Sequence, residues 1–142
     1  MALYQIVLDT NVLVAGLRSP HGASYQVLRL IGRGYFALNL SVPLVLEYES
    51  ILKQQIEVLP IGVADVDALI DYICRVSISH SIYYLWRPSL RDPKDEMVLE
   101  VAVTAGCDAI VTFNQRDFRG SDQYGIRILK PAALLQEIGV LK

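Results

Sequence analysis

The stretch that decides the fold is Ile6–Val14, with the sequence IVLDTNVLV. Its first residues continue an apolar run that starts at Tyr4 and is rich in residues that favour β-strands. Polar residues interrupt the run at Asp9-Thr10-Asn11, and apolar residues then continue up to Gly16. We interpret this order as a buried strand, a polar turn and the start of a helix. Asp9 is therefore expected where the first strand ends.

The rest of the chain alternates between short apolar runs and longer helical patterns. Strands are predicted at Phe36–Leu40, within Ile78–Trp86, at Ala109–Thr112 and at Ile126–Leu129. Helices are predicted around Val27–Ile31, after the N-cap residue Ser41, over Val63–Val76, from Pro93 with Asp92 as N-cap, and over Pro131–Ile138. This order predicts one domain over residues 1–142, a three-layer α/β/α fold with a central, mostly parallel sheet of about five strands.

Composition excludes several classes of protein. The chain has 142 residues, 53% of them hydrophobic, with a net charge of −2. This mild acidity disfavours tight, non-specific binding of duplex nucleic acid. Cys74 and Cys107 lie far apart and lack a C-x-x-C partner, so neither a disulfide framework nor a structural zinc site is expected. No apolar run reaches about 18 residues and no leader opens the chain, so we expect a cytoplasmic protein without a membrane segment.

Four acidic residues fall where they could meet at one edge of the predicted sheet. Asp9 closes the first strand, Glu47 lies on the helix after the second strand, Asp95 lies in the first turn of a later helix, and Asp117 follows the strand that ends at Thr112. Ligand sites of such sheets lie at the carboxyl ends of the strands. Converging carboxylates repel one another unless a cation is present. Oxygen donors without His or Cys suit Mg²⁺ or Mn²⁺, which commonly serve phosphoryl chemistry.

Each of these residues also has an ordinary structural interpretation. Asp9 could cap the helix that follows it, and Asp95 could complement a helix dipole. Glu47 could be a surface residue of its helix, and Asn114 and Asp117 could be turn residues. The sequence contains no G-x-G-x-x-G motif and no P-loop, so a dinucleotide or nucleoside triphosphate site is not expected. The joint pattern of acids therefore carries more weight than any one member.

Together, these segments resemble the PIN domain, the fold of many metal-dependent ribonucleases. The resemblance covers nearly the whole chain and rests on IVLDTNVLV at Ile6–Val14, Glu47 after the second strand, DPKDEMVLEVA at Asp92–Ala102 and AIVTFNQRDF at Ala109–Phe118. The chain is most similar to small prokaryotic PIN proteins that are regarded as toxins of toxin–antitoxin pairs.

The resemblance implies a set of site residues. Three residues match the central acids of the family: Asp9, Glu47 and Asp95. The fourth family acid commonly sits two residues after the threonine that matches Thr112, where this chain has the neutral Asn114. Asp117, three residues further on, is then expected to supply the missing charge. Asn11 and Thr112 match positions that often support the site by hydrogen bonds.

The resemblance also implies a function. It predicts an endoribonuclease that depends on Mg²⁺ or Mn²⁺ and cleaves single-stranded RNA, with an antitoxin protein as partner and a homodimer as its assembly. Two alternatives remain open. One is a PIN-fold module that binds RNA or protein and has a weak site because of Asn114. The other is a phosphatase with Asp9 as nucleophile, for which Lys130 is the candidate lysine after a late strand.

Overall fold

A computed structural model describes residues 3–82 and 93–141. Its centre is a five-stranded sheet with the strand order β3-β2-β1-β4-β5. The strands are β1 (Tyr4–Leu8), β2 (Phe36–Leu40), β3 (Ile78–Ser79), β4 (Ala109–Val111) and β5 (Arg127–Leu129). Every neighbouring pair is parallel. All five strands therefore end at the same edge of the sheet, as the alternating sequence pattern predicted.

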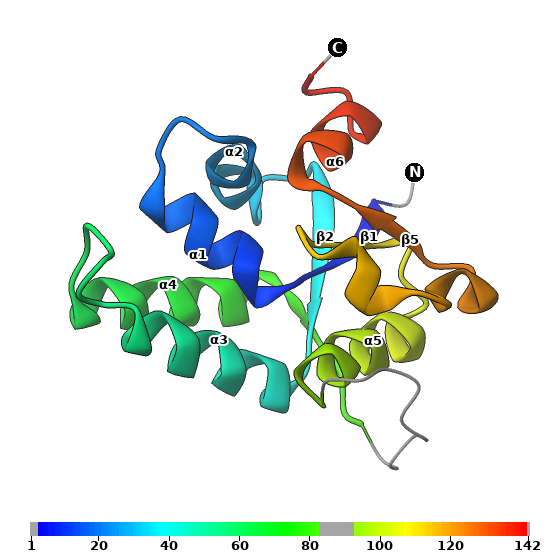
Figure 1. Ribbon diagram of the computed structural model, residues 1–142, viewed down its shortest axis with the longest axis horizontal. Coiled ribbons are helices and arrows are strands. Elements are labelled where there is room, and N and C mark those ends of the chain that lie inside the picture. Colours follow the sequence, from blue (N-terminus) through cyan, green and yellow to red (C-terminus); the bar gives the residue numbers. More distant parts are fainter. Residues whose placement is uncertain (1–2, 83–92, 142) are drawn as a thin grey trace.

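Helices cover both faces of this sheet (Figure 1). They are α1 (Thr10–Arg18), α2 (Ala23–Leu30), α3 (Val42–Gln54), α4 (Val63–Val76), α5 (Pro93–Ala105) and α6 (Pro131–Glu137). α5 packs against β1, β2 and β4, whereas α2 contacts both α1 and α6. None of the helices in the described residues is long and apolar enough to cross a membrane. The predicted three-layer α/β/α architecture is confirmed.

The predicted elements agree closely with the observed ones. β2 and α4 have the predicted bounds, and Ser41 caps α3 by accepting a hydrogen bond from the Leu44 N–H over 3.3 Å. The strand expected within Ile78–Trp86 is β3, while residues 83–86 and the expected N-cap Asp92 lie outside the described residues. The sequence patterns did not predict two short 3-10 helices, η1 (Gln115–Phe118) and η2 (Ser121–Tyr124), between β4 and β5.

The buried side chain of Asn39 links neighbouring segments of the sheet by hydrogen bonds. Asn39 in β2 is 1% exposed. Its amide nitrogen donates to Gln5 Oε1 over 3.0 Å and to the Ile6 carbonyl over 3.2 Å, and its Oδ1 lies 2.8 Å from His80 Nε2. Buried polar groups need such partners, because an unpaired one has lost its hydrogen bonds to water. The network joins β2 to β1 and to the segment after β3. Its contact with Asn39 gives His80 a structural role.

The contact between α1 and α2 gives a test of the packing that positions the first strand and helix. A Cβ added at Gly16 would lie 2.5 Å from Leu28 Cδ1 and 3.2 Å from the backbone carbonyl carbon of Ser24. We therefore expect Gly16→Ala to lower the free energy of unfolding by about 1–3 kcal/mol, although alanine favours helix. Urea denaturation measures this change.

Gly22→Ala is the matched control. A Cβ at Gly22 would have Ser19 Oγ as its nearest neighbour, at 3.9 Å. The backbone φ of Gly22 is −88°, which alanine adopts without strain. The control should change the free energy of unfolding by less than about 0.5 kcal/mol. Equal effects of the two substitutions would contradict the close approach of α1 and α2.

Candidate functional site

An acidic cleft opens at the carboxyl edge of the sheet. Its volume is about 450 Å³. Its walls come from one face of α1, from α3, from the first turn of α5 and from the segment after β4. Four carboxylates line it, together with two asparagines: Asp9, Glu47, Asp95, Asp117, Asn11 and Asn114. The structure therefore brings all four acids singled out from the sequence to one cleft.

The parallel topology explains this convergence. Asp9 directly follows β1, and its N–H donates to the Val111 carbonyl at the end of β4 over 2.9 Å. Glu47 lies in α3, which begins where β2 ends, and Asp95 lies in the first turn of α5. Asp117 lies in η1, just after β4. Segments distant in the sequence thus meet because their strands end at one edge.

Asp9 occupies the N-cap position of α1, but its side chain makes no capping hydrogen bond. Its Oδ2 instead accepts a hydrogen bond of 2.7 Å from the Thr112 hydroxyl. Thr112 is fully buried. The carboxylate of Asp9 is therefore held toward the end of β4 and the cleft, and the simpler interpretation of Asp9 as a helix cap does not account for its orientation.

Thr112 and Asn11 organise the turn beside Asp9. The Thr112 Oγ1 accepts hydrogen bonds from the Asn114 N–H over 3.0 Å and from Asn11 Nδ2 over 3.4 Å. Asn11 Oδ1 in turn accepts the Phe113 N–H over 3.4 Å. These bonds join the start of α1 to residues 112–114. Both side chains thus hold neighbouring segments of the cleft wall in place.

The electrostatics of the cleft disfavour a further negative charge. Burial raises the pKa of the Asp9 carboxyl, and the nearby carboxylates of Asp117 and Glu47 raise it further. The hydrogen bonds from Thr112 and from the Thr10 backbone oppose this shift in pKa without cancelling it. A cation in the cleft would favour the ionised form of Asp9 and relieve this repulsion.

The donor set fits a hard divalent cation. Carboxylate and amide oxygens line the cleft, and these are the ligands that Mg²⁺ and Mn²⁺ prefer. Within residues 3–82 and 93–141, no three His, Cys, Asp or Glu side chains lie close enough to hold one ion together. Mg²⁺ usually keeps several of its waters and binds one or two carboxylates directly. The cleft therefore suits an ion held partly through water.

Sequence reasoning missed two residues of the site. Arg18 lines the cleft from the last turn of α1, on the same helical face as Asn11 and Val14. The spacing of these three residues, three or four apart, was a signal that could have found it. Tyr48 is fully buried and donates to the Leu8 carbonyl, below Asp9. Its pKa is raised well above the usual value, by burial first and by the charge of Asp9 second.

Among the described side chains, those that line the cleft do not include the lysine that the phosphatase alternative needs. Lys130 is exposed at the N-cap of α6. Among the described residues, the basic side chain on the cleft wall is that of Arg18, not of Lys130. Asp9 therefore faces other acids and an arginine rather than the expected lysine.

The raised pKa of Asp9 predicts a stability effect with a defined sign. Compared with the unfolded chain, the folded protein favours the neutral form of the Asp9 carboxyl. The contribution of Asp9 to the free energy of unfolding is therefore complete below the unfolded-state pKa of about 3.9, and it is lost as pH rises through the folded-state pKa. We expect Asp9→Asn to raise the free energy of unfolding at about pH 7 in metal-free buffer. The difference from the wild type should shrink below about pH 4.

Urea denaturation at several pH values measures this effect. Glu49→Gln is the control, because Glu49 does not line the cleft and instead pairs with Lys53 over 3.5 Å. A wild-type protein that is as stable as Asp9→Asn at neutral pH, or a difference that is independent of pH, would contradict the assignment.

Comparison with known proteins agrees with this fold. Among solved structures, the chain is similar to VapBC2 from Rickettsia felis bound to a DNA fragment from their promoter, with 15% identity and a TM-score of 0.53. The match covers 89% of this chain and 98% of that chain, and at this identity it shows a shared fold. A search of curated proteins found no match. The sequence profile of the PIN domain matches residues 5–116. The chain therefore belongs to the PIN domain family.

Proposed function

We propose that the protein is an endoribonuclease that depends on Mg²⁺ or Mn²⁺ and hydrolyses phosphodiester bonds in single-stranded RNA. The observation that carries this proposal is the convergence of Asp9, Glu47, Asp95 and Asp117 on one cleft in a PIN domain. Carboxylates without His or Cys favour a hard metal ion, and such ions in carboxylate sites commonly serve phosphoryl transfer.

Each group of the cleft has a role in this proposal. Asp9, Glu47 and Asp95 would hold a first ion, directly or through water, and Asp117 with Asn114 would form a weaker second position. When bound, the ion supplies an activated water and neutralises charge on the phosphate. Thr112 orients the Asp9 carboxylate through its 2.7 Å hydrogen bond. Arg18 offers a guanidinium to a phosphate oxygen at the cleft wall.

The same cleft suggests a protein partner. An antitoxin that inserts a lysine or arginine among the four carboxylates would block the cation site and neutralise the cleft. A homodimer is proposed as the assembly. Val42 and Leu46 support it, because they lie one turn apart on α3 and are 65% and 58% exposed. Exposed apolar side chains grouped in this way are typical of protein interfaces.

Two acids on α3 give a matched test of the proposed chemistry. Glu47 lines the cleft, and Glu49 does not. We expect Glu47→Gln and Asp9→Asn to lower kcat for cleavage of single-stranded RNA by at least about 100-fold, because each removes a carboxylate from the proposed cation site. Glu49→Gln should stay within about twofold of the wild type, since exposed ion pairs contribute little.

Cleavage of a labelled oligoribonucleotide in Mn²⁺ measures these rates, and circular dichroism checks that each variant is folded. A folded Asp9→Asn variant that cleaves at the wild-type rate would refute the proposal. Wild-type protein that neither cleaves RNA nor binds millimolar Mn²⁺ in calorimetry would favour the module that only binds RNA or protein.

The neutral Asn114 allows a test by gain of function. Asn114 lines the cleft beside Asp117, so Asn114→Asp adds a carboxylate to the weaker position. We expect this variant to bind Mn²⁺ about tenfold more tightly at that position, measured by calorimetry. Gln136→Glu is the control, because Gln136 is exposed on α6 and does not line the cleft. Equal Mn²⁺ affinities of wild type and Asn114→Asp would remove Asn114 from the cation site.

A further inference from the structure

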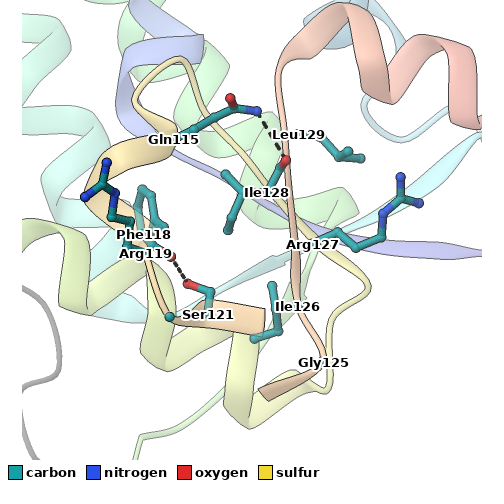
Figure 2. A pocket seen from close by; sticks show the side chains of 10 residues that line it. Gln115, Phe118, Arg119, Ser121, Gly125, Ile126, Arg127, Ile128 and Leu129 are labelled. Carbon is teal, nitrogen blue, oxygen red and sulfur yellow. Dashed lines mark hydrogen bonds between the residues drawn. The ribbon is translucent and has the colours of Figure 1, made fainter. Parts of the chain in front are cut away.

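A second hollow lies beside the acidic cleft, and we call it the β5 groove. Its volume is about 580 Å³, and η1, η2 and β5 bound it (Figure 2). Its walls include Gln115, Phe118, Arg119, Ile126, Arg127 and Ile128. η1 and its flanking residues contribute to both hollows, because Asn114 and Asp117 line the cleft whereas Gln115 and Phe118 line the groove. The two hollows thus share η1 as a wall.

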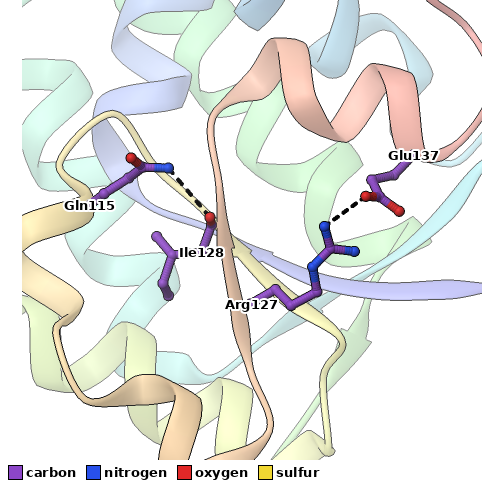
Figure 3. Close-up of polar contacts among 4 residues, drawn as sticks. All are labelled: Gln115, Arg127, Ile128 and Glu137. Carbon is purple, nitrogen blue, oxygen red and sulfur yellow. Dashed lines mark hydrogen bonds and ion pairs between the residues drawn. The ribbon is translucent and has the colours of Figure 1, made fainter.

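The β5 groove has an apolar floor and a cationic rim. Phe118, Ile126 and Leu129 are 1%, 3% and 6% exposed. Arg119 and Arg127 are exposed at the rim. Nη2 of Arg127 pairs with Glu137 Oε1 over 2.7 Å, and Arg127 also interacts with Tyr4, so Arg119 is the rim arginine that a ligand can bind without displacing these contacts (Figure 3). The buried floor offers little surface to a base, whereas the exposed Arg119 suits the anionic phosphate of a nucleotide.

Basic residues outnumber acidic ones near the groove, although the chain as a whole carries a net charge of −2: residues 116–130 also contain two acids, Asp117 and Asp122. Of the basic residues, Arg119 and Arg127 line the groove itself. Four exposed basic residues fall within residues 116–130: Arg116, Arg119, Arg127 and Lys130. Among the described residues, an ion pair is found for Arg127 but not for the other three. Cations without a carboxylate partner can bind phosphate without first losing an ion pair.

The edge of β5 distinguishes RNA from an extended peptide as the occupant. β5 is the last strand of the sheet, so a peptide could add to it as a further strand. The Gln115 side-chain amide, however, already donates to the Ile128 carbonyl over 3.4 Å (Figure 3). A peptide strand would have to displace this group, whereas a phosphate bound at the arginines would leave it in place.

We propose that the β5 groove binds nucleotides of single-stranded RNA that flank the scissile phosphodiester, with Arg119 as the phosphate contact. This inference rests on the proposed ribonuclease function. Because residues of η1 line both hollows, a strand with one phosphate in the cleft can pass over η1 and reach the groove. The groove then holds the substrate by its backbone and positions it, while the acidic cleft carries the chemistry.

The test compares long and short RNA. Cleavage of a twelve-nucleotide oligouridine and of a trinucleotide is measured in Mn²⁺ for wild type, Arg119→Ala and Arg119→Glu. For the long substrate we expect Arg119→Ala to raise KM by roughly three- to tenfold with kcat unchanged, and Arg119→Glu to raise it more. KM for the trinucleotide should not change, because a substrate this short does not occupy the β5 groove.

Binding of the same labelled twelve-nucleotide RNA in EDTA separates this inference from the proposed function. Arg119→Ala should weaken binding by the same factor and make the slope of log affinity against log salt concentration about 0.7 less steep. Arg33→Ala is the matched control, since Arg33 is exposed in the segment between α2 and β2, at the amino end of the strands and away from the β5 groove. The RNA affinity and the KM of the Arg33→Ala variant should equal those of the wild type.

The outcomes are distinguishable. If wild type binds the RNA through Arg119 but never cleaves it, the ribonuclease proposal fails and the β5 groove stands. If wild type cleaves RNA while both Arg119 variants bind and cleave the long substrate normally, the groove proposal is overturned and the ribonuclease stands. The groove proposal is also overturned if the wild type fails to bind the RNA in EDTA. It is equally overturned if an acidic peptide binds through Arg119 and RNA does not.

Discussion

The hydrogen bond from the Thr112 hydroxyl to the Asp9 carboxylate is the contact on which the geometry of the site depends. β1 and β4 are neighbours in a parallel sheet, so both residues arrive at the same edge directly after their strands. Thr112 is fully buried, and its oxygen also accepts the Asn114 N–H and the Asn11 amide. A buried hydroxyl with its partners in place has little freedom to reorient. One side chain thereby fixes Asp9 relative to the turn that leads to Asp117.

The carboxylates that form the proposed cation site also lower the stability of the folded protein. Asp9 is half-buried above Tyr48, and Asp117 and Glu47 lie near enough to raise its pKa. Repulsion among these groups disfavours the folded state as long as they are all charged. The burial of apolar residues in β1 and β4 stabilises the fold and offsets this repulsion. The proposed cation would relieve the same repulsion, so the cost in stability and the proposed chemistry have one origin.

Much of this fold follows from local sequence patterns, and the remainder depends on contacts that such patterns do not contain. β2 and α4 were predicted with their observed bounds because apolar periodicity changes sharply at Ser41, Gly62 and Ser77. Asp9 could be placed because it ends a buried strand. Glu47 and Glu49 are separated by about 200° around α3, so periodicity alone does not say which one faces the cleft. Neither η1 nor the β5 groove was predicted, since both depend on how the segment after β4 packs against β5.

The central claim is that the carboxylates of the cleft bind a divalent cation, and a crystal soaked in Mn²⁺ tests it most directly. The anomalous signal of manganese locates the ion without reference to activity. We predict a peak between Asp9, Asp95 and either Glu47 or Asp117, with waters completing its coordination. Carboxylates that lie together around the cleft without a peak at saturating Mn²⁺ would contradict the claim, and the chain would then be a PIN domain that binds its partners without metal-dependent chemistry.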